Sequence, residues 1–76
     1  MINIDEKTIG QAIRKFRRER KLKQQSINEA MGMGASWLSD VERAKQTITF
    51  NDVLKLCDIM NVDIDELTDF IMKQNK

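Results

Sequence analysis

Basic side chains are concentrated in one stretch of this sequence. Seven of the thirteen Lys and Arg residues lie between positions 14 and 23, namely Arg14, Lys15, Arg17, Arg18, Arg20, Lys21 and Lys23. Residues 1–45 carry ten basic and six acidic side chains, whereas residues 46–76 carry three and six. Such a basic half is typical of a surface that binds a polyanion such as nucleic acid, with the acidic half facing solvent or a partner.

The sequence lacks the groups that enzymes and metal sites use. It contains no His and one cysteine, Cys57, so neither a Cys/His zinc site nor an internal disulfide is expected. No paired carboxylates, nucleophile–base set or phosphate-binding loop can be assembled from it. We therefore expect no enzymatic activity, no cofactor, no metal and no small-molecule substrate. Without a signal peptide or an apolar run of about 18 residues, the sequence predicts no membrane contact and a cytoplasmic location.

Composition and periodicity predict an all-α fold in a single domain spanning residues 1–76. The chain has 41% hydrophobic residues, three Gly and no Pro. Apolar spacing and capping residues predict five helices, over 6–21, 24–31, 35–43, 50–61 and 64–74. Asp5, Thr49 and Asp63 are the expected N-caps of the first, fourth and fifth helices, and Gly32 is expected to end the second.

The second and third helices, at about 24–43, form a helix-turn-helix because a short glycine-containing turn joins them. Their apolar residues are expected to pack against the first helix: Ile27, Met31, Met33, Leu38 and Val41. Short side chains remain for the outer face of the third helix: Ala35, Ser36, Ser39 and Asp40. Such a face allows a helix to lie deep in a DNA major groove and reach the base edges.

From Ile9 to Leu67 the sequence resembles the lambda-repressor/Cro-like (XRE-type) family of helix-turn-helix DNA-binding proteins. The matching marks are Ile9-Gly10, Ile13-Arg14, Arg17, Leu22, Gln24, Gly32, Trp37-Leu38-Ser39, Val41-Glu42-Arg43, Leu54, Asp58 and Asn61-Val62 with Ile64-Asp65-Glu66-Leu67. The resemblance implies a compact five-helix fold that binds double-stranded DNA.

The resemblance also implies roles for individual residues. Gln24 corresponds to a glutamine that binds a DNA phosphate and supports the recognition helix, and Lys23 stands beside it in place of the usual Thr cap. Arg17 and Glu42 correspond to an ion pair between the first and third helices. The full set expected to contact DNA is Lys23, Gln24, Gln25, Ala35, Ser36, Ser39, Asp40, Arg43, Lys45 and Thr47.

Besides Lys23, several residues depart from the family pattern: Asn28, Gly34, Asp40, Ala44 and Ile48. Asn28 replaces a small residue at a close helix contact, which either loosens the packing or adds a hydrogen bond. Asp40 puts a negative charge toward a polyanion. Its carboxylate either accepts a hydrogen bond from a cytosine amino group or turns away to Arg43 or a partner subunit.

The C-terminal helix carries more apolar residues than one small core needs. It either caps the first and fourth helices or forms a twofold interface, for which we expect Leu67, Phe70, Ile71 and Met72. The preferred hypothesis is a bacterial or phage transcriptional regulator that binds operator DNA as a homodimer. The alternatives are an antitoxin or antirepressor whose main partner is a protein, and the DNA-binding end of a longer regulator.

Overall fold

The computed structural model describes residues 5–74, which form five α-helices and no strand. In chain order these are α1 (Glu6–Glu19), α2 (Gln24–Met31), α3 (Trp37–Glu42), α4 (Phe50–Met60) and α5 (Ile64–Gln74). The all-α fold with five helices is the one that the sequence predicts, and most helix ends lie within two residues of the expected positions.

Local signals explain where several helices begin. The Asp5 carboxylate accepts the backbone N–H of Thr8 at 2.9 Å, and the Thr49 hydroxyl accepts that of Asp52 at 3.1 Å. Each bond satisfies one of the N–H groups that the first turn of a helix leaves without a partner. Because the Asp5 carboxylate accepts hydrogen bonds from Thr8, its pKa lies below the ordinary value. Asp63 accepts the N–H of Asp65 at the start of α5.

Left-handed residues mark where several helices end. Gly32 has φ of 71° after α2, and Asn61 has φ of 55° after α4. Lys21 and Ala44 take the same conformation, at 56° and 61°. The reversal at Lys21 explains why α1 is shorter than the predicted 6–21. The third helix also begins two residues later than predicted, because residues 35 and 36 form a turn.

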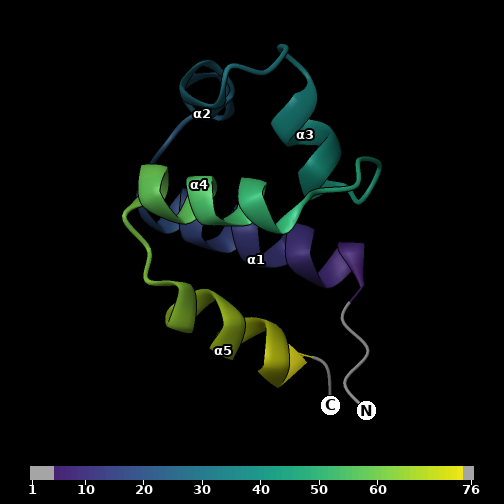
Figure 1. The fold of residues 1–76 in the computed structure, drawn as a ribbon, viewed down its shortest axis with the longest axis vertical. Helices are drawn as coiled ribbons and strands as arrows, with labels where there is room; N and C mark the ends of the chain where they lie inside the picture. The colour runs from purple at the N-terminus through teal and green to yellow at the C-terminus, as the bar shows by residue number, and fades with distance from the viewer. Residues whose placement is uncertain (1–4, 75–76) are drawn as a thin grey trace.

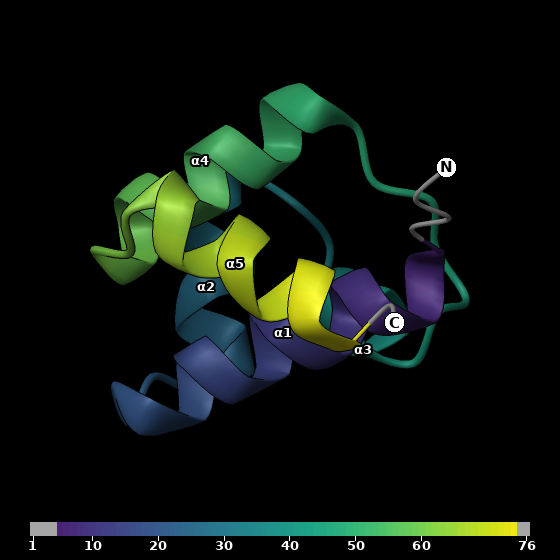
Figure 2. The same cartoon turned by 90° about the horizontal axis from the view of Figure 1, so that it is seen from below.

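The helices are arranged in three levels (Figure 1). α2 and α3 lie at one end, α5 lies at the other end, and α1 and α4 lie between them. α1 packs against both α3 and α5, and Figure 2 shows α5 in front of α1 when the molecule is seen from below. α1 therefore connects the helix-turn-helix to the C-terminal helix.

One core joins all five helices. Its most fully buried large side chains are Ile13, Ile27, Leu38, Val41, Leu56, Met60 and Leu67. Cys57 also lies in this core, where burial and the nearby Asp63 raise the pKa of its thiol. The prediction that Met33 packs in the core is wrong, because Met33 lies in the turn after α2 and is 38% exposed.

Candidate nucleic-acid interface

α2, the turn after it and α3 form the helix-turn-helix that the sequence predicts. Leu38 and Val41 point into the core, with exposed fractions of 0% and 2%. The opposite side of α3 and the turn before it present Ala35 and Ser36, which are exposed, and Ser39, which is partly exposed. The outer face therefore carries short side chains, as expected for a helix whose backbone must approach base edges.

The end of α3 is tied to α1 by the expected ion pair. Arg17 Nε donates to Glu42 Oε2 at 2.6 Å, and Nη2 donates to Oε1 at 3.1 Å. Arg17 Nη1 also donates to the carbonyl oxygen of Leu22 at 2.9 Å. The side chains are 13% and 3% exposed. A two-point charged contact of this kind fixes geometry as well as distance, so it holds α3 at one angle to α1.

Gln24 joins this contact from the start of α2. Its Nε2 donates to Glu42 Oε1 at 3.0 Å, so the glutamine supports the recognition helix as the resemblance implies. The amide nitrogen also carries a second N–H donor. Lys23 and Gln25 on either side are exposed, and Lys23 makes no side-chain capping bond to α2.

The loop after α3 carries the remaining residues of the set that the resemblance assigns to DNA. Arg43, Lys45 and Thr47 are exposed. Arg43 Nη2 lies 3.3 Å from Asp40 Oδ1. The Asp40 carboxylate therefore pairs with Arg43 in this structure, which is the second of the two arrangements that the sequence predicts. The backbone N–H of Lys45 donates to the Asp40 carbonyl oxygen at 2.8 Å, which holds the loop against the end of α3.

A small polar cavity lies where these elements meet. It has a volume of about 140 Å³ and is lined by Arg14, Arg17, Gln24, Ser39, Glu42 and Arg43. Arg14 lies about one helical turn before Arg17, which places both side chains on the same side of α1.

The expected dimer residues occupy different environments. Leu67 and Ile71 are 1% and 6% exposed within one chain, so their assignment to an intermolecular interface is wrong. They face the core because α5 packs on α1. Phe70 is partly buried, with its ring edge-on to Phe16 at 6.1 Å between centroids and 81° between planes. Of the four, Met72 is the one that remains substantially exposed, at 42%.

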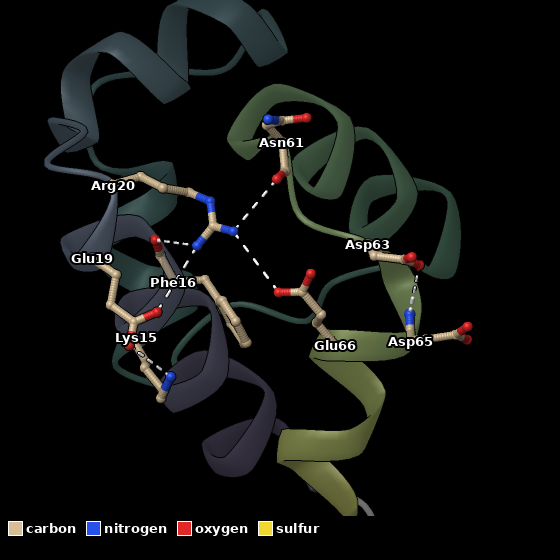
Figure 3. Close-up of polar contacts among 8 residues, drawn as sticks. All are labelled: Lys15, Phe16, Glu19, Arg20, Asn61, Asp63, Asp65 and Glu66. Atoms are coloured by element: carbon tan, nitrogen blue, oxygen red, sulfur yellow. Dashed lines mark hydrogen bonds and ion pairs between the residues drawn. The ribbon is translucent and has the colours of Figure 1, made fainter.

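Arg20, the residue directly after α1, contacts the junction between α4 and α5 (Figure 3). Its Nη1 donates to the Phe16 carbonyl oxygen and its Nη2 to the Asn61 carbonyl oxygen, both at 3.4 Å. The guanidinium also lies 3.9 Å from carboxylate oxygens of Glu19 and Glu66. Arg20 therefore joins α1 to the α4–α5 junction, a structural role for one member of the basic stretch.

Within residues 5–74, no group of three or more His, Cys, Asp or Glu residues is arranged to hold a metal ion. No helix in this range is long and apolar enough to cross a membrane.

The fold and this surface define a DNA-binding protein of the helix-turn-helix class. Residues 8–70 match the family model described as a helix-turn-helix domain, and the chain belongs to this family. The ImmF control region 10 kDa protein of Bacillus phage phi105 is 30% identical over 64 residues, which cover 84% of this chain and 71% of the phage protein. The resemblance to the lambda-repressor/Cro-like family is thereby confirmed.

Solved structures of regulators share the fold. The restriction-modification controller protein C.AhdI from Aeromonas hydrophila superposes with a TM-score of 0.74 and 26% identity, over 82% of this chain and 94% of its own. The clp gene regulator ClgR from Corynebacterium glutamicum gives a TM-score of 0.86 with 16% identity, over 100% and 97%. The first of these proteins is a controller protein and the second a gene regulator, and at 16% identity the second shows the shared fold alone.

Proposed function

We propose that this protein recognises a specific DNA operator by placing the outer face of α3 in the major groove. The observation that carries the proposal is the exposed face of Ala35, Ser36 and Ser39 on a helix whose opposite face is locked in the core. Hydroxyl groups of Ser accept and donate hydrogen bonds to base edges, and Ala suits contact with a thymine methyl group.

Basic and neutral polar groups lie on two sides of this face. Lys23 and Gln25 lie at the start of α2, and Arg43, Lys45 and Thr47 lie in the loop after α3. In this proposal they contact phosphates on either side of the groove and fix the position of α3, while α3 reads the sequence. The acidic residues of 46–76 lie mainly on α4 and α5, and α5 is at the opposite end of the molecule from α2 and α3 (Figure 1).

Selection from a random duplex library tests the proposal. We expect one enriched motif that the protein binds more tightly than scrambled duplex. A library that returns no motif, with the protein folded, contradicts it and favours an antitoxin or antirepressor. Nothing in the structure favours that second function at present, because Asn28 and Asp40 both have partners inside the chain.

A pair of opposite charge changes tests how the loop contacts DNA. Lys45→Ala should weaken binding to operator and scrambled duplex alike, and reduce the slope of log K against log salt concentration by about one. Asp40→Ala should strengthen both, because it removes a negative charge and releases Arg43. Titrations of labelled duplexes at several salt concentrations measure both effects. If Asp40→Ala instead changes binding only at one symmetric pair of operator positions, its carboxylate reads a base.

We also propose that the protein binds its operator as a symmetric homodimer. Two half-sites joined by twofold symmetry supply contacts that one small domain lacks. Met72 is the most exposed member of the expected interface, and it lies on α5 two residues after the partly exposed Phe70.

Met72→Asp should give a folded monomer with weaker operator binding. Because Met72 is exposed, the change should leave the melting temperature almost unaltered, whereas Phe70→Asp would also remove the ring contact with Phe16. Sedimentation with and without operator measures the oligomeric state. Phe50→Asp is the matched control, since Phe50 is 70% exposed on α4. If the dimer persists in Met72→Asp but is lost in Phe50→Asp, the interface lies on α4. If the unmutated protein is monomeric with and without operator, the homodimer is excluded.

A further inference from the structure

Asn28 is the most deeply buried polar residue in the described part of the chain. It lies in the middle of α2 and is 2% exposed, while the other polar and charged residues of 5–74 keep more contact with solvent. A buried amide without hydrogen-bond partners costs free energy, so its partners show what it does.

Both functional groups of the Asn28 side chain bind the segment that leads into α3. Its Nδ2 donates to the carbonyl oxygen of Ala35 at 2.9 Å, and its Oδ1 accepts the backbone N–H of Leu38 at 2.9 Å. Its backbone carbonyl oxygen accepts the N–H of Met33 at 2.8 Å. Asn28 therefore binds the start of the loop after α2 through its backbone, and the beginning of α3 through its side chain.

α3 depends on this contact because its own N-cap does little. Ser36 occupies the N-cap position, but its side chain makes no capping hydrogen bond. Leu38 is the second residue of α3, and its N–H is one that an N-cap side chain normally satisfies. The Asn28 amide performs this function from the neighbouring helix, and its bond to Ala35 fixes the residue just before the cap.

The two Asn28 bonds enclose the residues that face the DNA. Ala35 is itself one of them, Ser36 lies between the bonded positions, and Ser39 follows directly after Leu38. The core contacts of Leu38 and Val41 hold α3 against the domain but fix only its inner side. The backbone N–H of Trp37 donates to the Gly34 carbonyl oxygen at 3.2 Å and closes the turn at residues 35 and 36, and the Asn28 amide ties this turn to α2.

We infer that Asn28 is a positioning residue that determines DNA sequence discrimination by fixing the lead-in and first turn of α3. The inference rests on the proposed function. Non-specific binding depends on phosphate contacts from exposed basic residues such as Lys23 and Lys45, which Asn28 does not contact. Loss of the amide should therefore lower specific binding far more than non-specific binding.

Asn28→Ala tests the inference at a temperature where far-ultraviolet circular dichroism shows the variant to be folded. We expect affinity for the selected operator to fall about tenfold or more, which corresponds to the loss of about one to two hydrogen bonds. Affinity for scrambled duplex should change less than about twofold, as expected when phosphate contacts are intact. The matched control is Ile71→Ala, which destabilises the core from α5 and should leave the ratio of the two affinities unchanged.

Asn28→Asp separates the two bonds, because a carboxylate retains the acceptor for Leu38 N–H but loses the donor to Ala35. It should recover part of the discrimination. Hydrogen exchange of the Leu38 amide without DNA gives an independent reading. Exchange should be faster in Asn28→Ala than in the unmutated protein and remain slow in Asn28→Asp.

The outcomes separate this inference from the proposed function. If the unmutated protein selects no motif, the proposed function fails, and the specificity role of Asn28 fails with it even if Leu38 exchange is altered. If a motif exists and Asn28→Ala keeps the unmutated ratio of specific to non-specific affinity, the inference alone is overturned. An equal loss of that ratio in Ile71→Ala would also overturn it, since general destabilisation would then explain the effect.

Discussion

Gly10→Ala should destabilise this protein more than any other single-methyl change that the structure suggests. A Cβ at position 10 would lie 2.5 Å from the carbonyl oxygen of Val41 and 2.9 Å from that of Glu42. Both are backbone atoms, so no side chain can rotate away, and α1 must separate from the end of α3. Overpacking costs about 1–3 kcal/mol and sometimes more, which outweighs the gain of about 1 kcal/mol from replacing a helical glycine.

We expect a net loss of about 2 kcal/mol or more in the free energy of unfolding, which is the upper end of the overpacking cost less the helical gain, out of a total of about 4–11 kcal/mol for a chain of this length. Urea unfolding followed by circular dichroism measures it. Gly34→Ala is the matched control, because a Cβ there meets nothing within 4 Å. Gly34→Ala should be nearly neutral. Equal stability of the two variants would show that α1 and α3 are not in backbone contact.

Glu42→Gln should also lower stability strongly, because it leaves the Arg17 guanidinium partly buried without its counter-charge. The two side chains are 13% and 3% exposed, and removing one partner of a buried ion pair typically costs about 3–5 kcal/mol. Operator binding should fall as well, since Gln24 and Arg17 hold the end of α3 through Glu42.

Glu19→Gln provides the comparison for Glu42→Gln. Glu19 pairs with Lys15 at 2.8 Å, but both side chains are 40% or more exposed. Exposed pairs contribute about 0–1 kcal/mol, so this variant should melt within a few degrees of the unmutated protein. Thermal unfolding of both variants decides the matter. An unchanged melting temperature for Glu42→Gln would mean that water solvates the Arg17 guanidinium well enough to replace the lost carboxylate.

The number and order of helices could be predicted because their signals are local. Asp5, Thr49 and Gly32 act on residues within one turn of themselves, and the helix-turn-helix follows from two short helices around a glycine. The roles of Arg17 and Glu42 required the family resemblance, because these residues lie 25 positions apart.

Other features depend on contacts that no local pattern encodes. Apolar spacing on α5 indicates a broad apolar surface but not which part of it faces α1, so it does not separate the buried Leu67 and Ile71 from the exposed Met72. Gly10 looks like an ordinary helix residue until α3 is placed against it. From the sequence, Asn28 either loosens the packing or adds a hydrogen bond. The choice between these two interpretations depends on where residues 35 and 38 lie in three dimensions.

The packing of α5 on α1 has a consequence for biosynthesis. Phe16 lies early in the chain, and its ring is covered by Phe70, which the ribosome adds more than fifty residues later. At about 5–20 residues per second, several seconds separate the two. During that interval the side of α1 that packs against α5 has no cover from α5. We expect a chain that ends before residue 70 to expose this apolar surface, because α5 closes the core only after the helix-turn-helix has been synthesised.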